Sequence, residues 1–173
     1  SGACMLVRRD VFVKVGGLDA TFFAHNEEID LCWLMRCRGY RLRCIPASVV
    51  YHVGGGTLEA ESPRKTFLNF RNNLLMLYKN IPEYALRRVM LTRRILDYIA
   101  AAKFLLNGYP SNAKAVYEAR REFYRIKYRY ESIRKANLEQ RVVKQIPEIM
   151  KGSLLVSFYL KGMKRFSHLK FIR

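Results

Sequence analysis

The sequence has 173 residues, of which 50% are apolar, and it is strongly basic, with a formal net charge of +18. This apolar fraction excludes an intrinsically disordered chain, and the length predicts one compact domain with an appended element. The longest apolar stretch, residues 95–106, is interrupted by Asp97 and Lys103, so we expect no helix that spans a membrane.

The positive charge is concentrated in the second part of the chain. Residues 1–60 hold 7 Lys and Arg against 6 Asp and Glu, whereas residues 61–173 hold 25 against 8. Such an imbalance predicts an anionic partner for the second part, which could be lipid headgroups, nucleic acid or an acidic substrate.

Four cysteines are present, at positions 4, 32, 37 and 44. They show no CxxC spacing and form no Cys/His set that suits a structural zinc ion. We therefore expect reduced thiols in the protein core and a reducing compartment.

The first 62 residues predict mixed α/β structure. Residues 3–7 are a short apolar run typical of a strand, and residues 10–15 have helical spacing that stops at Gly16 and Gly17. Residues 29–38 predict a second helix, which ends before Gly39. Two β-prone pieces follow, residues 41–45 and 48–53.

Beyond Pro63 the sequence predicts basic, amphipathic helices. Residues 65–78, 84–106 and 113–136 have helical spacing and are separated by proline-containing turns, and residues 145–169 predict a weaker helical tail. In the second of these helices, most apolar residues lie broadly on one side, while Arg87, Arg94 and Asp97 lie on another.

Three carboxylates lie close together in the stretch FFAHNEEIDLCW, namely Glu27, Glu28 and Asp30. Acids favour the first turn of a helix, where they complement the helix dipole and the free backbone N–H groups. Neighbouring helical positions also point about 100° apart, so one acid can cap the helix while another faces a cleft as a general base. The spacing alone leaves both interpretations open and favours capping.

Four segments occur in the order SGACMLVRRDVF, VGGLDATFFAHNEEIDLCW, GYRLRCIP and VVYHVGGGT. This order resembles the second half of bacterial family 2 glycosyltransferases, which are inverting, metal-dependent enzymes of the GT-A fold and include rhamnosyltransferase-like proteins. The resemblance covers residues 1 to about 82, and the later helices resemble the variable tail of that family. It implies an α/β protein: the acceptor-side half of a GT-A nucleotide-diphospho-sugar transferase fold in residues 1–62, followed by a helical, basic region in residues 63–173.

The resemblance also implies roles for particular residues. Ser1, Gly2 and Ala3 match a strand that lines the sugar-donor site, although a glycine there could equally serve close packing. Glu27 and Glu28 match the acidic pair of the family, in which the second residue is usually an Asp that deprotonates the acceptor. Glu28 is therefore the expected base, assisted by Glu27.

Other matched positions belong to the substrate and metal sites. His52 matches a late histidine that helps to hold Mn²⁺ or Mg²⁺ at the donor diphosphate, whereas a lone His at a strand end is more often structural. Gly54, Gly55 and Gly56 could form a loop over the substrates or merely a turn. Asp30 and Trp33 could contact substrate, although organising the helix start and core packing, respectively, are the simpler roles.

These features together predict a glycosyltransferase that works in the synthesis of cell-envelope polysaccharide. Its partners would be a nucleotide-sugar donor, a saccharide or lipid-linked acceptor and the anionic inner face of the bacterial cell membrane, where we expect it to be peripheral and cytoplasmic. The Asp-x-Asp that carries the metal in this family has no counterpart here, so we expect the chain to be inactive alone. The alternative is a nucleic-acid-binding module, because Arg and Tyr alternate through ARREFYRIKYRYESIRK; against it, the aromatic residues fall at helical spacing, so no nucleic acid is expected.

Overall fold

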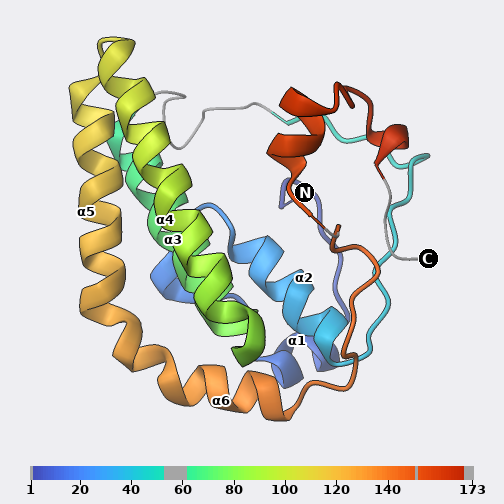
Figure 1. The fold of residues 1–173 in the computed structure, drawn as a ribbon. Coiled ribbons are helices and arrows are strands. Elements are labelled where there is room, and N and C mark those ends of the chain that lie inside the picture. The colour runs from blue at the N-terminus through green and yellow to red at the C-terminus, as the bar shows by residue number, and fades with distance from the viewer. Residues whose placement is uncertain (1, 53–61, 151, 170–173) are drawn as a thin grey trace.

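The computed structural model describes residues 2–52, 62–150 and 152–169, and these form helices joined by loops (Figure 1). The main helices are α1 (Arg9–Val15), α2 (Glu27–Cys37), α3 (Pro63–Asn80), α4 (Glu83–Leu106), α5 (Pro110–Ile126) and α6 (Glu131–Glu139). Shorter turns of helix lie at Ala20–Phe22, Lys127–Tyr130, Val156–Leu160 and Phe166–His168. No helix within the described ranges has the apolar length needed to traverse a bilayer.

Helix α3 is the centre of the molecule, because it contacts α2, α4, α5 and α6 (Figure 1). It begins where Pro63 occupies the first turn and the hydroxyl of Ser62 accepts a hydrogen bond from the Lys65 backbone N–H at 3.2 Å. Its C-terminal end is capped from α6, where the Arg134 guanidinium donates to the Tyr78 carbonyl and, at 2.7 Å, to the Ile81 carbonyl. The start of α3 is therefore set by local sequence, and its end is stabilised by a contact with α6.

Two apolar clusters hold the helices together. The larger one joins the turn before α2 to α3, α5 and the start of α6, through Phe22, Leu74, Leu75, Met76, Phe123, Ile126 and Tyr130. The smaller one joins α1 to α2, through Val11, Val15, Leu31 and Met35. Helix α2 therefore contributes to both clusters, since Trp33 also packs against the larger one.

The predicted helices up to residue 136 are confirmed, with two differences, whereas the helical tail predicted over residues 145–169 is wrong: its described residues are mostly irregular, with short helical turns at Val156–Leu160 and Phe166–His168. The expected helix over residues 113–136 is divided into α5 and α6 by the tighter turn at Lys127–Tyr130. Asp97, which sequence periodicity placed on the polar side of α4, is fully buried instead. Arg120 of α5 donates to its carboxylate at 2.6 Å, which explains how a charge is tolerated there.

The prediction of β-structure is wrong for the described residues, which contain no strand. Residues 3–7, 41–45 and 48–52 are irregular and mostly exposed, and the expected α/β class is replaced by a helical arrangement in the part that the structure describes. A strand needs a neighbour to satisfy its backbone N–H and C=O groups, and no described segment pairs with these stretches. The cysteine prediction is half right: all four thiols are free, but Cys4 and Cys44 are exposed.

Candidate active site

The loop before α2 has an unusual backbone. Phe23, His25 and Asn26 adopt φ angles of 60°, 70° and 69°, a left-handed conformation that costs free energy for any residue with a Cβ. Three such residues within four positions persist only where the surrounding structure fixes them. The loop leads directly into Glu27, the first residue of α2.

Helix α3 fixes this loop through the side chain of Asn72. That residue is completely buried, and its amide nitrogen lies 2.8 Å from each of the carbonyl oxygens of Phe22, Ala24 and His25. Two amide hydrogens are thus shared among three acceptors. The neighbouring Arg71 donates to the Thr21 carbonyl at 2.5 Å and to the Asn72 side-chain oxygen, which orients the amide.

Glu27 and Glu28 lie at the start of α2 with half-buried side chains. One oxygen of each carboxylate, together with Nε2 of His25, is buried and has no hydrogen-bond partner among the described residues. The acids complement the helix dipole, as the capping interpretation requires. Their free, buried oxygens go beyond capping, because such atoms are normally paired and are a feature of functional sites.

The structure brings Gly2 and Glu28 together. A Cβ added to Gly2 would lie 3.3 Å from both Cγ and Cδ of Glu28, so any larger side chain would press on the carboxylate. Ala3 is exposed next to Gly2 in the chain, and Ser1 lies outside the described residues. Gly2 therefore has a steric reason to be glycine that concerns the candidate base directly.

Asp30 faces away from this site into the protein interior. Its carboxylate pairs with the ammonium group of Lys79 at 2.5 Å and accepts a hydrogen bond from the Asn80 amide at 2.7 Å. Lys79 also pairs with Asp19 at 3.0 Å. Asp30 thus anchors the first turn of α2 to the end of α3, in line with a role in organising the helix start.

The three charges of this cluster respond differently to burial. Burial outweighs the attraction of Lys79 and raises the pKa of Asp30 above its ordinary value. At Asp19 burial acts in the same direction, but Lys79 outweighs it and lowers the pKa. Burial disfavours the charge on Lys79, yet the two carboxylates together raise the pKa of the lysine. The ammonium group is therefore the charge that holds the cluster together.

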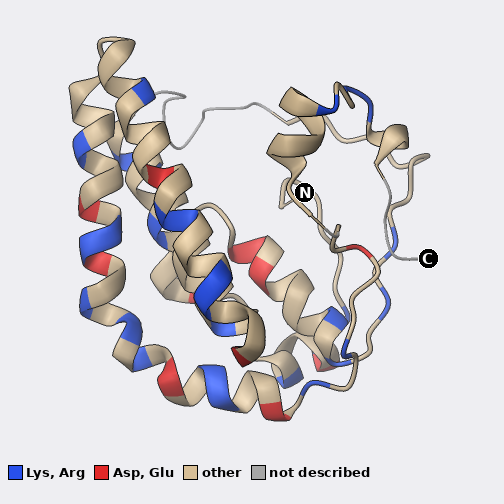
Figure 2. Cartoon of the chain, viewed as in Figure 1, with Lys and Arg blue, Asp and Glu red and all other residues tan. Residues whose placement is uncertain are grey.

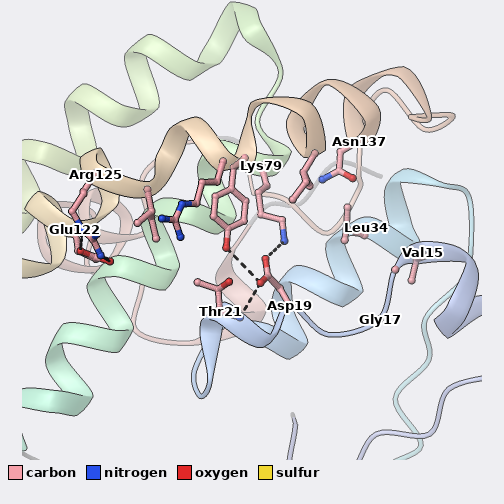
Figure 3. A pocket seen from close by; sticks show the side chains of 14 residues that line it. Val15, Gly17, Asp19, Thr21, Leu34, Lys79, Glu122, Arg125 and Asn137 are labelled. Carbon is pink, nitrogen blue, oxygen red and sulfur yellow. Dashed lines mark hydrogen bonds and ion pairs between the residues drawn. The ribbon is translucent and has the colours of Figure 1, made fainter.

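A cavity of ≈ 470 Å³ lies on the other side of this cluster (Figure 3). Its walls include Val15, Leu34, Asp19, Lys79 and Arg125, and neither Glu27 nor Glu28 lines it. Figure 3 shows Lys79 and Thr21 pointing toward Asp19 within the cavity. The polar groups here largely pair with one another. Because neither candidate glutamate lines the cavity, it is separate from the candidate base.

The remaining predicted site residues are not gathered around Glu28. Trp33 packs against the larger core cluster, His52 is exposed in an irregular segment, and Gly54, Gly55 and Gly56 lie outside the described residues. Within the described ranges no three His, Cys, Asp or Glu side chains come close enough together to hold a metal ion. The described residues therefore do not form a site for Mn²⁺ or Mg²⁺.

Sequence reasoning missed Asn72 and Lys79, although a signal was present. Both occur on the apolar face of α3, at helical spacing from Leu68 and Leu75, and both are buried. A polar residue in an apolar helical stripe needs a buried partner, and the partners here are the loop carbonyls and two carboxylates.

The Arg/Tyr-rich segment of α5 and α6 is used largely inside the protein. Phe123 and Tyr130 belong to the larger core cluster, and Arg120 and Arg134 are buried in contacts with Asp97 and with the end of α3. The groups that a nucleic acid would contact are thus partly engaged already, which weakens the nucleic-acid alternative.

Comparisons with known proteins found partial matches to glycosyltransferases. The chain is 32% identical over 103 residues to rhamnosyltransferase WbbL of Escherichia coli (strain K12), covering 58% of this chain and 35% of that protein. It is 29% identical over 75 residues to the low-salt glycan biosynthesis hexosyltransferase Agl10 of Haloferax volcanii, covering 43% of this chain and 24% of that protein. It is 38% identical over 52 residues to the N-acetylglucosaminyl-diphospho-decaprenol L-rhamnosyltransferase of Mycobacterium tuberculosis (strain H37Rv), covering 30% of this chain and 17% of that protein.

The chain thus spans about a third or less of the length of these curated relatives. No family model matches it, and no solved structure matches it. What the chain shares with characterised proteins is a partial similarity to glycosyltransferases, among them rhamnosyltransferases.

Proposed function

We propose that this chain is the acceptor-side part of an inverting family 2 glycosyltransferase with the GT-A fold, and that Glu28 is its general base. The observation that carries the proposal is the placement of the Glu28 carboxylate. It lies beside Gly2 at the end of a loop that Asn72 holds by three carbonyl contacts, and one of its oxygens is buried without a partner among the described residues. A carboxylate that follows a fixed loop and has a free oxygen is suited to accept a proton.

The proposed reaction is a single displacement. A hydroxyl oxygen of the acceptor attacks the anomeric carbon of the nucleotide-sugar, and the bond from that carbon to the diphosphate oxygen breaks as the new glycosidic bond forms. Glu28 takes the hydroxyl proton, and the diphosphate leaves with the electron pair. Glu27 lies next to Glu28 and takes no part in the proton transfer. The acceptor oxygen attacks the face opposite the departing diphosphate, which inverts the configuration at the anomeric carbon.

The acceptor is proposed to be a saccharide or a lipid-linked saccharide. The name of the mycobacterial relative includes a diphospho-decaprenol acceptor, which supports a lipid-linked substrate for this chain as well. The proposed place of work is the cytoplasmic face of the bacterial cell membrane, where cell-envelope polysaccharide would be assembled.

The test of this proposal is Glu28→Gln in the full-length enzyme. Glutamine keeps the size and shape of the side chain but cannot take the proton, so turnover should fall by ~10²-fold or more while donor binding is retained. Glu27→Gln is the matched control, since it removes the adjacent charge, and it should have a smaller effect. Near-normal turnover of Glu28→Gln, or a dead Glu27→Gln variant, would show that the base is assigned to the wrong residue.

A requirement for Mn²⁺ or Mg²⁺ stays a prediction, and no step above is assigned to the metal. It rests on the resemblance of His52 to the late histidine of the family. A metal titration of the full-length enzyme checks it: His52→Ala should raise the concentration of Mn²⁺ or Mg²⁺ needed for activity and leave the melting temperature unchanged, because the side chain is exposed. The same titration curve for both proteins would contradict it.

A further inference from the structure

Helix α4 exposes an apolar stripe along its whole length. Only Asp97 of this helix is buried, and it faces α5. Seven large apolar residues are exposed elsewhere on the helix: Tyr84, Leu91, Ile95, Tyr98, Ile99, Leu105 and Leu106. Most lie on the side opposite Asp97, and Tyr98 lies at the edge, with its ring centroid 5.7 Å from the Arg120 guanidinium carbon. With 24 residues, the helix presents a strip about 36 Å long. We refer to these seven residues as the α4 stripe.

Basic residues accompany the stripe. Arg87, Arg88, Arg94 and Lys103 are all exposed on α4. The helix contains one acid besides the buried Asp97, and this is Glu83, which pairs with Arg134 at 2.7 Å. Figure 2 shows Lys and Arg distributed along α4 and its neighbours α3 and α5. The stripe is thus an apolar surface bordered by cations with almost no opposing charge.

We propose that the α4 stripe is a docking surface for an anionic lipid membrane. An apolar strip with arginines beside it is the pattern of a helix that lies in the plane of a membrane, with aliphatic side chains among the acyl chains and cations at the lipid phosphates. Tyr84, near the start of the stripe, and Tyr98, near its middle, are both exposed. Tyrosine suits the headgroup level of a membrane, because its ring is apolar with one polar tip.

Charge distinguishes this partner from the other surfaces that could cover the stripe. A second copy of the chain would bring the same arginines face to face, which is repulsive. A nucleic acid would match the charge but would leave the aliphatic residues Leu91, Ile95 and Ile99 against a polar backbone. Anionic lipid satisfies both halves of the surface. The inference rests on the proposed function, whose place of work is a membrane face, and deepens it by naming the surface that meets the membrane. Its test is separate from sugar transfer, since it measures binding to vesicles alone.

The experiment is co-sedimentation of the full chain with vesicles. Vesicles that contain phosphatidylglycerol should bind it at low salt and release it as salt rises, whereas pure phosphatidylcholine should bind it weakly. The triple variant Leu91→Gln/Ile95→Gln/Ile99→Gln should lower affinity for the anionic vesicles at least ~10-fold, because it removes the apolar contribution. Glutamine is a good helix former, so circular dichroism and the melting temperature should stay unchanged.

The matched control replaces three exposed valines outside α4, in the triple variant Val13→Gln/Val49→Gln/Val142→Gln. Their exposed fractions, 68%, 71% and 74%, are at least as large as those of the stripe residues that are changed, so this variant removes as much exposed apolar surface elsewhere. It should bind vesicles as the unchanged chain does. A third variant, Arg87→Gln/Arg88→Gln/Arg94→Gln, should weaken binding at low salt and flatten its salt dependence.

Each other outcome overturns the proposal. Absence of binding to phosphatidylglycerol at low salt would show that the stripe meets no anionic membrane. Equal loss in the valine control would show that exposed apolar surface in general, and not α4, causes binding. A chain that is dimeric in sedimentation velocity, and becomes monomeric only when the stripe is changed, would assign the stripe to self-association. Binding of the chain to single-stranded DNA, without binding to vesicles, would assign the stripe to nucleic acid.

Discussion

At the scale of the residue, Asn72 determines the backbone on which Glu28 is carried. Its amide meets three carbonyl oxygens of a loop whose residues Phe23, His25 and Asn26 have positive φ angles. Left-handed conformations of this kind cost of order 1–3 kcal/mol each, so the loop depends on those contacts. Asn72 is a positioning residue, because it acts on the candidate base only through the loop.

We therefore predict that Asn72→Leu lowers the stability of the protein and, as a separate effect, lowers the turnover of the molecules that remain folded. The change leaves one buried and two partly buried carbonyls without this donor, so the free energy of unfolding should fall by a few kcal/mol, since a buried group left unpaired costs ~1–3 kcal/mol. In the full-length enzyme, turnover should fall at temperatures well below the melting temperature, while KM for the donor stays constant. Chemical denaturation and steady-state kinetics measure both.

Leu68→Ala is the control for this prediction, because it removes buried apolar volume one turn away in the same helix and no hydrogen bond to the loop. It should lower stability and leave the turnover of the folded enzyme unchanged. If both variants reduced turnover equally at matched folded fractions, the role of Asn72 would be merely structural.

At the scale of the element, the joint between α2 and α3 is an ion cluster whose stability depends on pH. Burial raises the pKa of Asp30, so its carboxyl binds a proton at a higher pH in the folded than in the unfolded chain. Folding stability from such a group is present below its unfolded pKa and is lost as pH rises through the folded pKa. Lys79 limits that loss, because its ammonium group stabilises the ionised carboxylate.

Lys79→Met should therefore destabilise the protein most at neutral pH. With the buried carboxylate of Asp30 and the half-buried one of Asp19 both left without their cation, the free energy of unfolding should fall by ~3–5 kcal/mol, as for other buried pairs broken on one side. Part of this loss should be regained as pH falls and Asp30 becomes protonated. In the unchanged protein the gain at Asp30 is opposed over the same range by protonation of the low-pKa carboxylate of Asp19, so its stability should rise less steeply as pH falls. Urea denaturation at several pH values measures the two slopes, and parallel slopes would contradict the assignment.

The helices were largely predictable because their signals are local. Proline and glycine mark the ends of α1, α3 and α5, and helical spacing fills the segments between them. The β-prone pieces were misassigned because a strand forms only beside a partner, which spacing does not reveal. Asp97 was misplaced for a similar reason: its partner, Arg120, lies 23 positions away in another helix.

The position of the candidate base on a helix start was predictable, and its surroundings were not. The acidic cluster marked the start of α2, whereas nothing in the sequence placed Gly2 beside Glu28, as the structure does. The positive φ angles of the loop were unpredictable, because such angles are uncommon even for His25 and Asn26 and are exceptional for a bulky residue such as Phe23. The loop conformation comes from Asn72, some 50 positions later, so no window of local sequence contains both.

At the scale of the whole molecule, the division into residues 1–62 and 63–173 is crossed by contacts. Asn72, Arg71 and Lys79 of α3 all bind groups in the first part, and Phe22 lies in the same core as Leu74 and Leu75. Contacts that are buried on both sides tie the stability of the two parts together. The division is thus one of sequence character, and we expect the parts to unfold as one unit.

This expectation has a direct test, because the chain contains a single tryptophan. Trp33 lies in α2 and packs against the larger core cluster, so it reports on the contact between the first part and the helices, whereas circular dichroism is dominated by the longer helices α3, α4 and α5. Thermal unfolding followed by tryptophan fluorescence and by circular dichroism should give the same midpoint. Two midpoints separated by several degrees would show that the first part melts independently of the helices.

The contact between Asn72 and the loop determines which second mutations can rescue a change at Asn72. All three acceptors are backbone carbonyls, so the clamp requires asparagine at one position and no particular side chain at residues 22, 24 or 25. A damaging change at Asn72 consequently has no reciprocal side chain that could be altered to restore it. In a genetic screen, suppressors of such a change should be true revertants or substitutions that stabilise the fold in general, and allele-specific suppressors in the loop should be absent.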